Sequence, residues 1–359
     1  MTPINNRLDS IQILRAIAAW LVVFHHYNQV FFNWDMSGTY IPYFISNFTH
    51  IYGKMGVDLF FIVSGLIMFI TISKSPNAMY FLLKRVIRVY PPYWFYTALL
   101  LVIVISSTQP YFLFEKYTLV SVAKSLMLIP NENPNGIGLY PFLTVGWTLF
   151  FEMAFYVICT LGLMTTTRYW WIITIAILTV IPKFWSLEWG SYFFKSSYIS
   201  EFAIGLSIGF ILIKSNLKKN MLISFSMIAL GIFNITPDTT NLLTQINLGL
   251  IVFGFAVMPE LKNRFFDAAV NLGSASYSTY LIHVIVLVTI YNFLGANPSG
   301  WEFTLSLITY LTVTAILSLY SYKYIEVGFV NRKLQAAISN LIMNGSKSVE
   351  NTKKLSADN

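Results

Sequence analysis

Stretches of about 20 apolar residues recur from one end of this chain to the other, and each is long enough to cross the hydrocarbon core of a bilayer as a helix. Backbone amides in hydrocarbon must be paired within the protein, and no alternating strand pattern competes with the helical one. The sequence therefore predicts an all-α, polytopic integral membrane protein with ten transmembrane helices. They are expected at residues 11–32, 51–73, 90–107, 140–162, 169–187, 196–214, 220–236, 244–260, 272–295 and 302–325.

The composition supports a membrane protein and argues against a soluble domain. Of the 359 residues, 56% are hydrophobic and 11% are charged, and the mean hydropathy is +0.63. A soluble globular domain carries about 25% charged residues. The formal net charge of +8 would suggest a nucleic-acid partner in a soluble protein, so the distribution of the basic residues decides its meaning.

The basic residues gather on one side of the predicted spans. With the N-terminus in the cytoplasm, 17 of the 22 lysines and arginines other than Arg15 lie on the cytoplasmic side. Such an excess is typical of cytoplasmic loops. We therefore expect both termini in the cytoplasm and no nucleic-acid partner. The tail at residues 344–359 is polar and lacks aromatic residues, so it is expected to be a disordered cytoplasmic tail.

The connection at residues 109–140 is the longest between the predicted spans and is expected on the outer side. Its run at residues 131–136 is rich in turn-forming residues, and residues 119–129 are consistent with a short interfacial helix. Cys159 is the only cysteine, so no internal disulfide can form. The four histidines are too few and too scattered to indicate a metal site.

Two ionisable residues, Arg15 and His26, lie eleven positions apart inside the first predicted span. Eleven residues are almost three helical turns, so both fall on one face with their Cα atoms about 16 Å apart, whereas His25 is rotated about 80–100° from that line. Ionisable residues in a span usually face a polar cavity, and a histidine can take a proton from a hydroxyl. The structural alternative is a buried histidine bonded to a neighbouring helix and an arginine that reaches the inner surface.

A basic cluster precedes the third predicted span. Arg85 and Arg88 are neighbours on a helix, and Pro91-Pro92 is predicted to break that helix and let a new one enter the membrane. Guanidinium groups suit phosphate, so the pair could hold a phosphorylated cytosolic cofactor. The same cluster also satisfies the positive-inside rule and suits lipid phosphate, and composition alone leaves both readings open.

The second predicted span carries a carboxylate, Asp58, near its outer end. Its expected partner is Lys54, one turn away, or His26 on the neighbouring span, and the first pairing would be purely structural. Ser64 and Gly65 follow in the same span, and such small residues allow helices to approach closely.

Two further spans contain polar groups. Glu152 follows Trp147 and must be paired or protonated inside a membrane, which leaves structural pairing and catalysis as alternatives. Ser276, Tyr280 and His283 are spaced i, i+4 and i+7, so they line one helix face. Bonds to neighbouring helices and contacts with a substrate are both consistent with that face.

These motifs, in this order, resemble the acyltransferase 3 family of bacterial membrane proteins, which includes O-acetyltransferases of exopolysaccharide, O-antigen and related surface glycans. The resemblance covers about residues 7–330, which we expect to form one transmembrane domain. Each motif alone is weak, but five in register are specific. The matching residues are Arg15 and His26; Asp58, Ser64 and Gly65; Arg85 and Arg88; Trp147 and Glu152; and Ser276, Tyr277, Tyr280 and His283.

The resemblance implies a multi-pass O-acyltransferase of the bacterial inner membrane, with acetyl-CoA as the co-substrate on the cytoplasmic side and no metal. The acceptor would be a hydroxyl of a cell-surface glycan or of its lipid-linked precursor. By the same resemblance, His26 is the catalytic base, Arg15 supports it, and Arg85 and Arg88 hold the donor phosphates. Either the chain completes the transfer itself, or a separate extracytoplasmic transferase partner does so.

Two alternative functions have to be separated from this one. A transporter or flippase of a glycan-lipid would also carry charged residues in its spans, but it predicts broken helices and often an internal repeat, and the sequence shows neither. A non-catalytic membrane partner of polysaccharide assembly would keep the motifs without their chemistry. Release of coenzyme A from acetyl-CoA by the purified protein distinguishes the enzyme from both.

Overall fold

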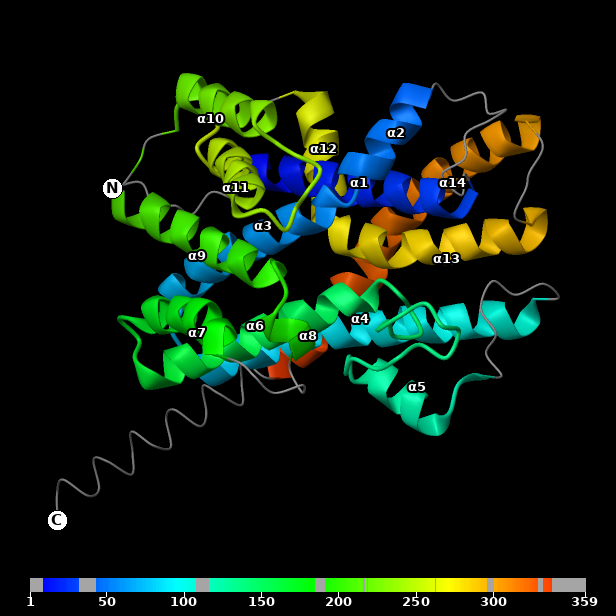
Figure 1. Ribbon diagram of the computed structural model, residues 1–359, viewed down its shortest axis with the longest axis horizontal. Helices are drawn as coiled ribbons and strands as arrows, with labels where there is room; N and C mark the ends of the chain where they lie inside the picture. The colour runs from blue at the N-terminus through cyan, green and yellow to red at the C-terminus, as the bar shows by residue number, and fades with distance from the viewer. Residues whose placement is uncertain are drawn as a thin grey trace, which may run out of the picture.

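The computed structural model describes residues 9–31, 43–107, 116–184, 191–215, 217, 219–261, 263–295, 300–328 and 332–337. Across these residues the chain is helical, without a strand, and the helices pack side by side as a bundle (Figure 1). The all-α prediction is therefore confirmed for the described part of the chain. The helices are α1 (Asp9–Phe31), α2 (Tyr43–Tyr52), α3 (Met55–Lys74), α4 (Ala78–Ser106), α5 (Leu119–Leu126), α6 (Gly146–Thr165), α7 (Trp170–Phe184), α8 (Ser191–Phe194), α9 (Tyr198–Ser215), α10 (Met221–Phe233), α11 (Leu242–Ala256), α12 (Arg264–Ser274), α13 (Ser276–Leu294) and α14 (Gly300–Ser321), and a π-helical turn η2 (Tyr322–Glu326) follows.

All ten predicted spans coincide with helices, but they differ in length. Six helical segments are long and apolar enough to cross a membrane, and these contain α3, α4, α6, α9, α13 and α14. Helices α7, α10 and α11 are apolar but shorter. The six long segments agree with a multi-pass membrane protein, while the count of ten spans stays a prediction. The predicted tail at residues 344–359 lies outside the described residues.

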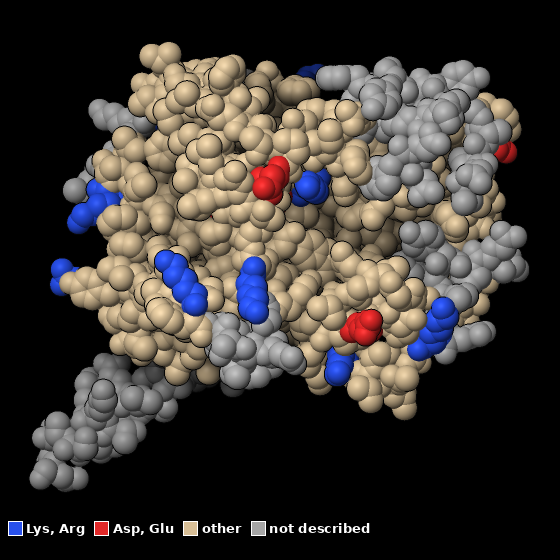
Figure 2. Space-filling model, in the orientation of Figure 1, with Lys and Arg blue, Asp and Glu red and all other residues tan. Residues whose placement is uncertain are grey.

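The surface of the bundle agrees with a lipid environment. Figure 2 shows few charged side chains on the visible face of the described part. Large apolar side chains are exposed on several helices, among them Ile105 of α4, Met164 of α6 and Phe225 of α10. Extended apolar surface of this kind marks contact with a membrane or with another protein.

Helix α4 corrects the prediction made for Pro91 and Pro92. The helix runs without interruption from Ala78 to Ser106, and both prolines lie inside it. A proline removes one hydrogen bond, but neighbouring helices can supply polar contacts that keep a membrane helix intact. Next to the carbonyls of residues 87 and 88, which the prolines leave without a helical donor, the Tyr277 hydroxyl of α13 donates to the Val89 carbonyl at 2.8 Å. Arg85 and Arg88 therefore lie on one continuous helix with the span, not before it.

Glycine lets helices α3 and α9 cross closely, as the sequence predicts for Gly65. A Cβ atom on Gly65 of α3 would lie 2.4 Å from the Phe202 carbonyl oxygen of α9. A Cβ atom on Gly205 of α9 would lie 2.0 Å from the Ile62 carbonyl oxygen. Neither position has room for a side chain, so the two backbones meet at the glycine pair.

Helix α13 is buried on all sides over its first thirteen residues. Every residue from Ser276 to Val288 is buried, and α1, α4 and α14 pack around it. A helix buried on all sides places its polar side chains inside the protein. Ser276, Tyr280 and His283 therefore face neighbouring helices and not lipid.

The described part of the connection at residues 109–140 contains the predicted short helix and the predicted turn. Helix α5 at Leu119–Leu126 is the predicted short helix and ends three residues earlier than expected. It is held to α4 because the Tyr93 hydroxyl donates to the Ser125 carbonyl at 2.7 Å. The run at residues 131–136 turns at Gly136, where φ is +76°, as its turn-forming residues predict.

Candidate functional site

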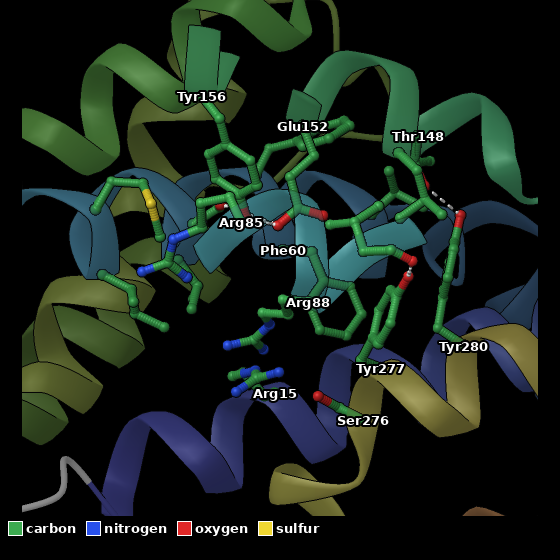
Figure 3. Close-up of a pocket in the computed structure, with 18 residues that line it drawn as sticks. Arg15, Phe60, Arg85, Arg88, Thr148, Glu152, Tyr156, Ser276, Tyr277 and Tyr280 are labelled. Atoms are coloured by element: carbon green, nitrogen blue, oxygen red, sulfur yellow. Dashed lines mark hydrogen bonds between the residues drawn. The ribbon is translucent and has the colours of Figure 1, made fainter. Parts of the chain in front are cut away.

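A narrow cavity of about 80 Å³ lies between α1, α3, α4, α6 and α13. It brings together residues of all five sequence motifs, although these are far apart along the chain. Figure 3 shows their side chains pointing into one space from several helices. The polar residues that line it are Arg15, Ser64, Arg85, Arg88, Thr148, Glu152, Tyr156, Ser276, Tyr277 and Tyr280.

Three arginines enter this cavity from two helices. Arg15 of α1 and Arg88 of α4 point toward one another, and Arg85 lies one turn of α4 away (Figure 3). Arg15 is only 8% exposed, and its guanidinium donates to the Gln12 side chain at 3.0 Å. Arg15 therefore lies inside the protein and does not reach to the inner surface. Three guanidinium groups on one small cavity favour an anionic ligand.

The environment of Arg85 leaves part of its guanidinium without a protein partner. The group lies over the rings of Phe81 and Tyr156, at 5.4 and 5.5 Å from their centroids. Its Nε–H group is buried and donates to no acceptor among the described residues. A buried donor without a partner is costly unless a ligand or water bonds it. The aromatic rings thus contact the charged group, and one of its donors has no partner among the described residues.

Glu152 forms the polar wall opposite the arginines. Its carboxylate accepts hydrogen bonds from the Tyr156 hydroxyl and, at 3.5 Å, from the Ser64 hydroxyl of α3 (Figure 3). No ion pair joins Glu152 to an arginine within the described residues. The carboxylate is therefore held mainly by hydroxyl groups. Glu152 and the buried Glu326 also interact electrostatically with Arg15 and Arg88 and offset part of their positive charge.

A second and wider cavity of about 570 Å³ lies beside the first. His25 and His26 of α1 both line it, together with aromatic residues and with Lys54 and Lys116. Val57 and Tyr280 line both cavities, so the two spaces meet at these side chains. We name the first space the arginine cavity and the second the histidine cavity.

Tyr280 is fixed at the boundary of the two cavities. Its hydroxyl donates to the Val145 carbonyl at 3.1 Å and lies 2.8 Å from the Thr148 hydroxyl (Figure 3). Both partners belong to the start of α6, so the bonds tie α13 to that helix. The phenol ring is therefore a fixed part of the wall between the cavities.

The two adjacent histidines have different surroundings. The His26 Nδ1 atom lies 3.1 Å from the Val22 carbonyl oxygen and 3.2 Å from Nε2 of His283. The His25 Nδ1 atom lies 3.3 Å from the Thr49 carbonyl oxygen of α2. His26 turns toward α13, a contact that the helical spacing does not predict. His25 turns toward α2, although its ring also reaches the histidine cavity.

Two further residues predicted for the site, Asp58 and Trp147, lie outside the arginine cavity. Asp58 is 2% exposed and lies beside Glu201 of α9, and it lines neither cavity. The structure records no ion pair of Asp58 with Lys54 or with His26 among the described residues. Trp147 lines the histidine cavity, where its ring centroid lies 5.3 Å from that of Tyr198.

The comparisons with known proteins place these residues in a family. The family model described as an acyltransferase domain matches residues 8–323. The chain belongs to the acyltransferase 3 family. One curated relative is the exopolysaccharide production protein ExoZ of Rhizobium meliloti (strain 1021), which is 34% identical over 119 residues. This alignment covers 33% of the chain and 36% of that relative. No solved structure matches the chain significantly.

Within this member of the acyltransferase 3 family, one polar lining residue has no counterpart among the sequence motifs. Tyr156 bonds Glu152 and lies beneath the Arg85 guanidinium, yet no motif pointed to it. The signal was present, because Tyr156 lies four residues after Glu152 and therefore on the same helix face. Thr148 lies four residues before Glu152, so Thr148, Glu152 and Tyr156 follow one another on the same face of α6.

Proposed function

We propose that this member of the acyltransferase 3 family transfers an acyl group, with acetyl as the expected group, from acyl-CoA to a glycan hydroxyl. The observation that carries the proposal is the meeting of two chemically different cavities at Tyr280. One holds three arginines suited to phosphate, and the other holds a histidine suited to proton transfer. A donor and an acceptor entering from opposite sides would meet at this boundary.

The arginine cavity suits the donor. Coenzyme A combines phosphates with a thin pantetheine arm, and the narrow arginine cavity offers guanidinium groups for the phosphates and a path between helices for the arm. The phosphates would bond Arg85 and Arg88 where their guanidinium groups line the cavity, and the Nε donor of Arg85, which has no partner among the described residues, fits that role. Arg15, one helix away, adds positive charge along the path of the arm.

The histidine cavity suits the acceptor. Its larger volume and its aromatic and lysine side chains fit a saccharide, and His26 lies in its wall. His26 would take the proton of the acceptor hydroxyl as the hydroxyl oxygen attacks the thioester carbon. The carbon–sulfur bond then breaks, and the imidazolium returns the proton to the departing thiolate. The products are an O-acyl ester and coenzyme A.

The orientation follows from the positive charge on the predicted loops. We propose that both termini lie in the cytoplasm and that ten spans cross the bacterial inner membrane, so that the arginine cavity opens to cytosolic acyl-CoA. Tags at residues 77, 217 and 350 should then be cytoplasmic, and tags at residues 37, 133 and 297 should be external. An external tag at residue 217 would contradict this topology.

The acceptor class rests on the relative. ExoZ is named for exopolysaccharide production, and we propose that the acceptor here is likewise a cell-surface glycan or its lipid-linked precursor. A separate extracytoplasmic transferase would be needed only if the chain passes the acyl group on without completing the transfer. The proposal is tested with purified protein in liposomes, acetyl-CoA labelled in its acetyl group, and the lipid-linked saccharide fraction of the producing cells.

The expected result is release of coenzyme A together with label in the saccharide. Movement of the saccharide across the membrane without release of coenzyme A would instead identify a transporter. Neither release nor movement, from protein that is folded and inserted, would favour a non-catalytic partner of polysaccharide assembly. Loss of surface O-acetyl groups in cells that lack the protein provides the matching measurement in vivo.

A further inference from the structure

His283 lines neither cavity, although it is fully buried in α13 and touches the proposed base. Its Nδ1 atom lies 3.0 Å from the Thr279 carbonyl oxygen. Its Nε2 atom lies 3.2 Å from Nδ1 of His26, and the two ring centroids are 5.1 Å apart. His283 therefore contacts His26 from a position outside both cavities, where it would touch neither the acyl donor nor the glycan acceptor.

The hydrogen bonds define which nitrogen of each ring carries a proton. A carbonyl oxygen only accepts, so Nδ1 of His283 must donate to Thr279, and Nε2 of the neutral ring is left as an acceptor. The His26 Nδ1 atom then faces two acceptors, the Val22 carbonyl oxygen and His283 Nε2. It must carry a proton, which leaves Nε2 of His26 with a free lone pair.

We propose that His283 is a positioning residue that holds His26 in the tautomer able to act as a base through Nε2. The proposal rests on the proposed function and deepens it by giving the late histidine of the chain a role in proton transfer. It joins α13 to α1 through one contact between residues 257 positions apart. The sequence alone offers no indication of that contact.

The role continues during the reaction. When Nε2 of His26 takes the hydroxyl proton, the ring becomes an imidazolium, and its Nδ1–H bond to His283 becomes charge-assisted and stronger. Passage of the Nδ1 proton to Nε2 of His283 would move the positive charge onto a ring that is fully buried and lines neither cavity, so the charge stays on His26. His26 thus keeps the proton until the thiolate leaves and then returns it. A buried carboxylate acts on the histidine of a Ser-His-Asp triad in the same sense.

The test compares two substitutions of similar size at residue 283. In His283→Gln the amide oxygen can take the place of Nε2 and accept from His26, whereas His283→Leu fills the space without an acceptor. His50→Gln is the matched control, since this histidine of α2 lines neither cavity. The assay is coenzyme A release from acetyl-CoA, with the lipid-linked saccharide fraction as acceptor and with acetyl-CoA varied to separate kcat from KM.

We expect His283→Leu to lower kcat by about 10- to 100-fold, the effect of losing a hydrogen bond to a charged group, with the KM for acetyl-CoA unchanged. His283→Gln should recover a large part of that loss, and His50→Gln should match the unsubstituted protein. Nitrogen-15 spectra of labelled histidine should show His26 protonated at Nδ1 in the unsubstituted protein, and a second tautomer should appear in His283→Leu.

Equal activity of the Gln and Leu variants, at equal folding and insertion, would overturn the proposal, because packing alone would then explain His283. Protonation of His26 at Nε2 in the unsubstituted protein would overturn it as well. If the Leu variant fails to fold, the Gln variant and the spectra of the unsubstituted protein still decide. Failure of the proposed function would give a different result, because His26→Ala would then release coenzyme A as fast as the unsubstituted protein.

Discussion

The arginine cavity and the histidine cavity are adjacent but differ in volume and in the side chains that line them. The first is narrow, about 80 Å³, and its polar groups are held by aromatic rings and hydroxyls around three guanidiniums. The second is about 570 Å³, and imidazoles, lysines and aromatic rings line it. A tight charged space suits one invariant cofactor, whereas a wide mixed space suits a variable saccharide. In the proposed mechanism, the donor therefore binds on one side of Tyr280 and the acceptor on the other.

The largest effect is expected from the base in the histidine cavity. His26→Ala should lower acyl transfer by about 10²- to 10⁴-fold, because the general base is removed while coenzyme A binding in the other cavity is untouched. His25→Ala should keep most activity, since its ring bonds the Thr49 carbonyl of α2 and not His283. The measurement is acetyl transfer by both purified variants at matched membrane levels.

The same two variants can show that the assigned roles of the two cavities are wrong. An inactive His25→Ala together with an active His26→Ala would mean that the helix face and the catalytic assignment are both wrong. A His26→Ala protein that no longer binds coenzyme A would mean that the two cavities do not act separately.

The second effect concerns the arginine cavity. Arg85→Ala or Arg88→Ala should weaken coenzyme A binding by about 1.5–3 kcal/mol each, the usual value of a hydrogen bond to a charged group. Lys214→Ala is the control, because this lysine lies in the last turn of α9 on the same predicted membrane face and lines neither cavity. Titration calorimetry in detergent measures all three. Equal losses would indicate a general effect of surface charge and would remove the specific donor site.

Local periodicity in the sequence predicts much of this arrangement. The spacing of Arg15 and His26 places them on one face of α1, and the spacing of Ser276, Tyr280 and His283 places them on one face of α13. Such faces follow from 3.6 residues per turn and need no knowledge of the partner helix. The helices themselves follow from the length of the apolar stretches, because hydrocarbon leaves the backbone no alternative.

What the sequence could not predict depends on contacts between distant segments. Asp58 faces Glu201 of α9 and not the cavities, because α3 packs closely on α9 at Gly65. The two prolines of α4 stay inside a helix, since tertiary packing outweighs the local rule that a proline ends one. The contact of His26 with His283 is of the same kind. Local rules show which residues share a face, but not which face meets which.

The smallest effect is expected at the wall that the two cavities share. Tyr280→Phe keeps the ring but loses the bonds to Thr148 and to the Val145 carbonyl, so transfer should fall about five- to thirtyfold, as for one to two neutral hydrogen bonds. Tyr280→Ala removes the ring as well and should join the two spaces. A closed site normally excludes water from the thioester, and without the ring, water from the histidine cavity would reach it.

Coenzyme A release without acceptor should therefore rise in the alanine variant and stay low in the phenylalanine variant. Release is measured with and without the saccharide fraction to separate hydrolysis from transfer. If both variants release coenzyme A equally without acceptor, the ring of Tyr280 does not divide donor from acceptor, and the two cavities form one site.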